Sequence, residues 1–151
     1  MSLYELRQDW NSAKAVAGEL SAQFPGDAEV LQAQAQAQFR AGDTDGAISS
    51  YKHAYELAPN SMPILSRYLS LLNTGKYFAQ AQGVLQEAIS RDPRNVALKG
   101  DLIRVESEIN GVDAAVAKAH ALAKDDPDND VYDLVSAEPE QSPDGHRLAV
   151  R

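Results

Sequence analysis

The chain has 151 residues, of which 22 are acidic and 14 are Lys or Arg, so its formal net charge is −8. It contains no cysteine, which excludes disulfides and thiolate metal sites. Residues 1–124 hold 14 acids against 12 Lys and Arg, a net of −2, and residues 125–151 hold 8 acids against 2 Arg, a net of −6. No basic footprint for nucleic acid and no apolar run of about 18 residues is present, so we expect neither a nucleic-acid partner nor membrane insertion of this segment.

Prolines and alanines recur with a fixed 34-residue period. A period of this length predicts one supersecondary unit copied in tandem, in which each copy buries its apolar face against the next. The recurring residues are Pro25, Pro59, Pro93 and Pro127, with Ala13, Ala47, Ala81 and Ala115 twelve residues upstream of them.

The first segment, residues 1–27, predicts one helix with Ala13, Ala17 and Leu20 on its apolar face. Only about eight residues precede this helix, too few for the first helix of a pair. We therefore expect a partial first repeat, with Trp10 in the core at the entrance to the helix. We also expect the chain to be a piece of a longer array.

The clearest copy covers residues 28–61. In its first half Leu31, Ala35 and Phe39 share one helical face, and Gly42-Asp43 predicts a turn and the start of a second helix. Ala58-Pro59 ends that helix, because the residue before a proline is disfavoured in helical geometry. Two further steps of the same period give helix pairs at residues 62–95 and 96–129. Their turn glycines, Gly75 and Gly111, are each displaced by one residue relative to Gly42, in opposite directions.

The last segment carries the acidic charge. Residues 130–137 predict a capping helix or the start of a further repeat, and residues 138–151 predict a disordered tail. Asp126, Asp128 and Asp130 resemble the opening of a calcium loop, but the glycine is missing and Ala137 replaces the closing Glu. A turn between helices is the preferred interpretation.

The pattern Ala47-x3-Tyr51-x2-Ala54-x4-Pro59, preceded by Gly42-Asp43 and Ala35, resembles the tetratricopeptide repeat (TPR). The resemblance covers about residues 1–129. It implies an all-α, right-handed superhelical solenoid of antiparallel helix pairs, with about three and a half repeats and a C-terminal capping helix.

Two stretches, AGDTDGAISSYKHAYELAPNS and AVAKAHALAKDDPDN, also resemble bacterial exopolysaccharide-associated TPR lipoproteins of the PEP-CTERM type. That resemblance implies a role in envelope polysaccharide export or assembly. It favours a periplasmic or outer-membrane-associated location, and a cytoplasmic one stays open.

The TPR resemblance further implies that the first helices of successive copies line a concave groove that binds a partner. Gln and Ser can donate and accept hydrogen bonds, and Arg can fork onto a carboxylate, so we expect a groove for an extended peptide or a partner helix. The alternative is that these are merely solvated faces. Some TPR proteins hold a chain-end carboxylate with Lys and Asn, but Gln32, Gln36 and Ser66 stand at those positions, which disfavours such a clamp. The groove residues are Gln32, Gln36, Arg40, Ser66, Arg67, Ser70, Thr74, Arg104 and Glu108.

No catalytic arrangement, phosphate-binding loop or cofactor motif emerges, and His53, His120 and His146 lie in separate elements without metal-ligand spacing. The sequence therefore predicts a non-catalytic binding scaffold without metal or cofactor. Two alternatives stay open. One is a self-associating module that forms homo-oligomers through its truncated N-terminal repeat, and the other is a regulatory arm of an enzyme whose catalytic domain lies elsewhere.

Overall fold

The structure is a computed structural model that describes residues 3–125, with side chains described for residues 9–124. The expected capping helix at 130–137, the turn at 126–130, His146 and the tail at 138–151 lie outside the described residues.

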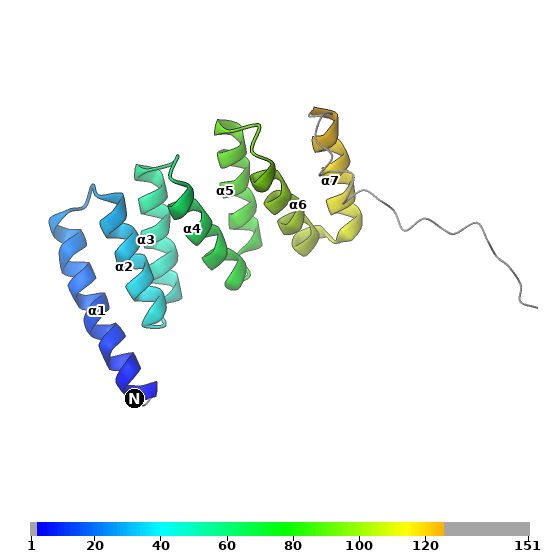
Figure 1. The fold of residues 1–151 in the computed structure, drawn as a ribbon. Helices are drawn as coiled ribbons and strands as arrows, with labels where there is room; N and C mark the ends of the chain where they lie inside the picture. Colours follow the sequence, from blue (N-terminus) through cyan, green and yellow to red (C-terminus); the bar gives the residue numbers. More distant parts are fainter. Residues whose placement is uncertain (1–2, 126–151) are drawn as a thin grey trace, which may run out of the picture. The chain divides into compact units, whose positions relative to one another are not determined.

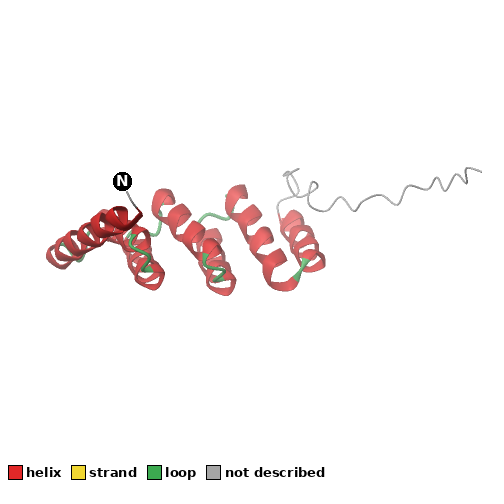
Figure 2. Cartoon of the chain, turned by 90° about the horizontal axis from the view of Figure 1, so that it is seen from below, coloured by secondary structure: helices red, strands yellow, loops and turns green. Residues whose placement is uncertain are grey.

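Every regular element in the described part of the chain is an α-helix, which confirms the predicted all-α class (Figures 1 and 2). The chain divides into two compact units, residues Met1–Ala88 and Ile89–Arg151, called the first and second unit below. The helices are α1 (Leu3–Gln23), α2 (Ala28–Arg40), α3 (Thr44–Leu57), α4 (Met62–Thr74), α5 (Phe78–Arg91), α6 (Val96–Asn110) and α7 (Val112–Asp125).

Short polar residues and a glycine set the limits of α2 and α3. The Asp27 carboxylate accepts hydrogen bonds from the backbone N–H groups of Glu29 and Val30 at the start of α2. Gly42 then takes a φ of +88°, a conformation that glycine adopts without a steric penalty. Asp43 caps α3 by accepting a hydrogen bond from the Gly46 backbone N–H at 3.0 Å. The sequence thus specifies a tight antiparallel hairpin.

Alanines form the contact surfaces of the helices in the first unit. Ala35, Ala47, Ala54 and Ala81 are fully buried, because a methyl side chain lets neighbouring helices approach closely. Larger side chains fill the space beside them, and the rings of Tyr55 on α3 and Tyr68 on α4 lie 6.3 Å apart. Of these alanines, Ala47 and Ala81 are separated by the predicted 34-residue period.

Hydrogen bonds between side chains join the two helices of each hairpin in the first unit. Ser50 on α3 donates to Gln38 on α2 at 2.7 Å, and Gln80 on α5 donates to Tyr68 on α4 at 2.8 Å. The polar Gln38 is therefore compatible with its half-buried position, since its oxygen has a donor.

The turn between α4 and α5, like the turn at Gly42, contains a residue in the left-handed conformation, but the residues differ. Lys76, one repeat period after Gly42, takes the left-handed conformation with a φ of 61°, whereas Gly75 is right-handed. Gly75 is needed for space, because a Cβ there would lie 2.5 Å from the Tyr77 ring. The Tyr77 hydroxyl donates to Asp45 at 3.0 Å and holds this turn beside the start of α3.

The second unit contains the hairpin of α6 and α7. Asn95 caps α6 by accepting a hydrogen bond from the Leu98 N–H, and Gly111 at φ +88° makes the turn. Ile103, Ala115 and Ala119 form its core, with Leu122 and Ala123 packed against it. Like the hairpin of α2 and α3, this hairpin has a side-chain cap at the start of its first helix and a glycine with a positive φ in its turn.

The N-terminal helix differs from its prediction. Trp10, expected at the entrance to a helix, lies well inside α1, which begins at Leu3. The prediction was wrong because the position one repeat period before Gly42 is Gln8, so no glycine interrupts the helix there.

We expect Ala47→Leu to lower the free energy of unfolding by about 1–3 kcal/mol, because added methylenes at a fully buried position force neighbouring side chains out of place. Ala33→Leu is the matched control, since Ala33 is exposed on α2. Urea unfolding monitored by circular dichroism measures both. Equal stability of the parent chain and Ala47→Leu would refute the helix register.

We expect Lys76→Gly to raise the free energy of unfolding by up to about 1 kcal/mol. A non-glycine residue such as Lys76 is destabilised by about 1–2 kcal/mol in the left-handed region. Glycine removes this penalty but loses more backbone entropy on folding, which offsets part of the stabilisation. Gly42→Ala should lower stability for the same reason. Thermal unfolding of both variants checks the pair, and a destabilised Lys76→Gly would contradict the explanation.

Candidate functional site

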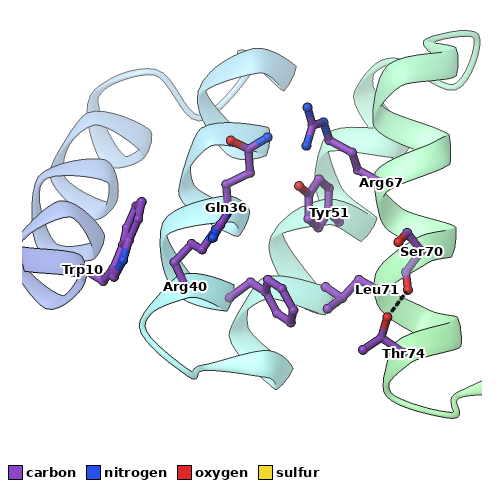
Figure 3. Close-up of a pocket in the computed structure, with 9 residues that line it drawn as sticks. Trp10, Gln36, Arg40, Tyr51, Arg67, Ser70, Leu71 and Thr74 are labelled. Carbon is purple, nitrogen blue, oxygen red and sulfur yellow. Dashed lines mark hydrogen bonds between the residues drawn. The ribbon is translucent and has the colours of Figure 1, made fainter. Parts of the chain in front are cut away.

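Four helices of the first unit surround a cavity with a volume of about 310 Å³, called the α2–α4 cavity below (Figure 3). Trp10 comes from α1, Tyr51 from α3, and the other lining residues from α2 and α4. The lining residues are Trp10, Gln36, Phe39, Arg40, Tyr51, Arg67, Ser70, Leu71 and Thr74.

The repeat places equivalent positions of two helices on the same cavity. Gln36 on α2 and Ser70 on α4 are one repeat period apart, as are Arg40 and Thr74. On each helix the two residues are four positions apart and therefore share one face. The repeat register therefore brings these four residues of α2 and α4 to one cavity.

Helix α1 adds an indole ring to the cavity. The Arg40 guanidinium carbon lies 5.5 Å from the centre of the Trp10 ring, a distance at which the ring face attracts the cation. An ion pair between Lys14 on α1 and Asp43 in the α2–α3 turn, 2.6 Å long, holds α1 beside this hairpin. The pair therefore helps to position Trp10.

Tyr51 forms a buried wall of the cavity, with its hydroxyl near Gln36 and Arg67 (Figure 3). Burial raises the pKa of this phenol, while hydrogen bonding with Gln36 and Arg67 acts in the opposite direction. The hydroxyl is therefore protonated at neutral pH.

The charge of the cavity is positive. Arg40 and Arg67 line it, and none of its lining residues is Asp or Glu. Among the side chains of residues 9–124, neither guanidinium has a carboxylate partner. The Thr74 hydroxyl donates to the Ser70 carbonyl at 2.8 Å, which leaves the Thr74 oxygen as an acceptor. The cavity is thus lined by two guanidinium groups, neutral polar groups and apolar side chains.

The structure brings five of the predicted groove residues to this cavity: Gln36, Arg40, Arg67, Ser70 and Thr74. Gln32 and Ser66 lie on the same two helices outside the cavity lining. Arg104 and Glu108 lie on α6 in the second unit, where Arg104 pairs with Asp101 of the same helix.

The apolar walls were not predicted as site residues. Trp10 was predicted to lie in the core, Phe39 was placed on the apolar face of its helix with Leu31 and Ala35, Tyr51 appeared only as part of the repeat pattern, and Leu71 was not singled out. For Phe39 that assignment was wrong, since its side chain is 43% exposed. The sequence held one signal for the position of Trp10, namely Gln8 in place of a turn glycine. Without a glycine there, α1 continues past Trp10.

The described part of the chain shows no group of three or more His, Cys, Asp and Glu side chains that could hold a metal ion. His53 and His120 are exposed. Between residues 3 and 125 no helix is both long and apolar enough to cross a bilayer.

Comparison with known proteins places this fold in the class of helical-repeat solenoids. The solved structure of MamA 41-end from Desulfovibrio magneticus RS-1 matches with a TM-score of 0.56 and 19% identity, over 82% of this chain and 70% of that one. The MamA RS-1 ArsTM double mutant matches with a TM-score of 0.57 and 19% identity, over 83% and 71%. At this identity the likeness concerns the fold.

The family model of the tetratricopeptide repeat matches residues 29–61, the segment that holds α2 and α3. No curated protein matches the chain. Residues 29–61 therefore match a tetratricopeptide repeat, which confirms the predicted resemblance, and the solved structures agree in fold. Folds of this type serve as protein-interaction scaffolds, with an extended surface for a partner.

We expect the free energy of unfolding of Asp43→Asn to fall less steeply than that of the parent chain as the pH is lowered. The hydrogen bond from Lys14, followed by that from the Gly46 N–H, lowers the pKa of Asp43 below its usual 3.8. The ionised Asp43 therefore stabilises the fold above pH 3.8, and this stabilisation is lost as the pH falls through the lowered pKa. Both side chains are more than a third exposed, so the effect is below about 1 kcal/mol. Asparagine keeps the helix cap.

Urea unfolding of both proteins between about pH 7 and pH 3 measures this difference. Glu19→Gln, an exposed change on α1, controls for the loss of one negative charge. Parallel curves for the parent chain and Asp43→Asn would show that the ion pair does not hold α1.

Proposed function

We propose that this chain is a non-catalytic scaffold that binds a peptide or helix of a partner protein in the groove between α2 and α4. The observation that carries the proposal is the α2–α4 cavity, which equivalent positions of two successive repeats line together. Its volume of about 310 Å³ is at the lower end of the range for small-molecule sites. That size suits one or two side chains of a partner better than a large cofactor.

The chemistry of the cavity supports a protein partner. Trp10 and Tyr51 are aromatic residues of the kind that dominate binding energy at protein interfaces, as is arginine. Phe39 and Leu71 extend the apolar surface, whereas Gln36 and Ser70 offer hydrogen bonds to a peptide backbone. Rigid helices hold all of these groups, so little order has to be gained on binding.

On the sequence resemblance to exopolysaccharide-associated TPR lipoproteins, we extend the proposal to an adaptor in bacterial envelope polysaccharide export or assembly. The resemblance alone supports this part. The identity of captured partners tests it.

A second candidate is self-association. Val16, Leu20 and Phe24 are 65%, 41% and 52% exposed and follow one another at intervals of four residues along α1 and its end. Such a spacing places apolar side chains on one helical face. This stripe favours docking of α1 on another molecule, which includes a second copy of the chain.

We expect Ser70→Trp to abolish capture of the partner, because an exposed serine that lines the cavity becomes a ring that fills it. Ser49→Trp, on an exposed position of α3, is the matched control and should capture as the parent does. The measurement is cross-linked capture from the source cells, after circular dichroism has shown equal folding.

Equal capture by both variants would move the binding surface away from the α2–α4 cavity. Recovery of the chain alone, unaffected by Ser70→Trp, would favour self-association through α1.

A further inference from the structure

We propose that the α2–α4 cavity recognises an acidic side chain, Asp or Glu, that stands next to an aromatic or aliphatic residue inside an extended partner peptide. This inference rests on the proposed function and adds the chemistry of the partner. Four features of the cavity lead to it.

The first feature is positive charge that has no carboxylate partner among the described side chains. Arg40 and Arg67 both line the cavity, no Asp or Glu does, and neither guanidinium pairs with a carboxylate among the described side chains. This is unusual in a chain with a net charge of −8. A guanidinium binds a carboxylate through two parallel hydrogen bonds, so an acid from the partner is the complement that the side chains of residues 9–124 do not provide.

The second feature is that the available donors are side chains. Trp10, Gln36, Tyr51 and Arg67 all lie beyond the first turn of their helices, where the backbone N–H groups are bonded within the helix. Capture of a chain end by free backbone N–H groups is therefore not available in this cavity, and Gln32, Gln36 and Ser66 replace the Lys and Asn side chains of a chain-end clamp. The carboxylate is therefore that of a side chain within the peptide.

The third feature is the apolar surface beside the arginines. The Trp10 ring lies against the Arg40 guanidinium, and Phe39 is 43% exposed although it is a large aromatic residue. The stacked indole limits the freedom of Arg40 before binding, which lowers the entropy cost of the complex. Phe39 and Leu71 offer contact surface for an apolar neighbour of the acid.

The fourth feature is the state of the neutral polar groups. Tyr51 is protonated because burial raises its pKa, so it adds a hydroxyl and no negative charge next to the ligand. Thr74 uses its proton on the Ser70 carbonyl and keeps an acceptor for a peptide N–H. The cavity thus provides for a carboxylate and for the peptide backbone that carries it.

The test is selection of random 12-residue peptides, displayed with both ends joined to carrier sequence, against the whole chain. Selected peptides are then synthesised with blocked ends and titrated by the fluorescence of Trp10, which is the only tryptophan of the chain and lines the cavity. We expect an acid within two residues of an aromatic or aliphatic residue in the selected peptides. Changing that acid to its amide should weaken binding about tenfold or more.

Arg40→Gln and Arg67→Gln should each weaken binding of the acidic peptide by a similar factor, and should remove most of the difference between the acid and the amide peptide. Arg67→Lys should retain part of the affinity, because it keeps the charge but loses the fork. Arg94→Gln is the matched control, an exposed arginine in the turn before α6, and should bind as the parent does. Circular dichroism establishes equal folding of all four variants.

Selected peptides that lack acids, yet lose enrichment with Ser70→Trp, would overturn this inference and leave the proposed function standing. Binding that requires phosphoserine in place of Asp or Glu would also overturn it. If no peptide is selected, the inference fails, and capture of folded partners by the parent but not by Ser70→Trp still decides the proposed function separately.

Discussion

The close approach of neighbouring helices at alanine is the constraint on which the rest of this structure depends. Ala35 on α2 and Ala47 and Ala54 on α3 are fully buried, and their methyl side chains let the two helices approach closely. Dense packing leaves no room to exchange these residues for larger ones. Because the position of Ala47 returns 34 and 68 residues later as Ala81 on α5 and Ala115 on α7, both buried, the chain builds successive hairpins from one pattern.

Much of the fold could be predicted, because it depends on local and periodic features. The proline and alanine period indicated the helix pairs, and Gly42-Asp43 marked a turn and a cap that the structure contains. Two features were not predicted, one because it depends on a contact that a sequence does not display, and one because a signal in the sequence was not used. Lys76 takes the left-handed position next to Gly75, where a Cβ would lie 2.5 Å from the Tyr77 ring, and α1 runs past Trp10 because Gln8 stands where a turn would need glycine.

The polar part of the candidate site followed from the repeat, whereas its apolar part did not. Gln36, Arg40, Ser70 and Thr74 occupy equivalent outward positions of α2 and α4, so the repeat register alone brings them together. The ring of Trp10 reaches the same cavity only because α1 lies beside α2, held in part by the Lys14–Asp43 pair. Helical periodicity assigned the aromatic residues to packing, and only the fold shows which of them border a cavity.

The most direct test of the central claim is to map a bound peptide by NMR on the isotope-labelled chain. Backbone and side-chain shift changes report which residues a ligand contacts, whatever the chemistry of the ligand. If the α2–α4 cavity is the binding site, the changes concentrate at Trp10, Gln36, Arg40 and Tyr51 and at residues 67–74. Changes concentrated along Val16, Leu20 and Phe24, or on α6 and α7, would contradict the account.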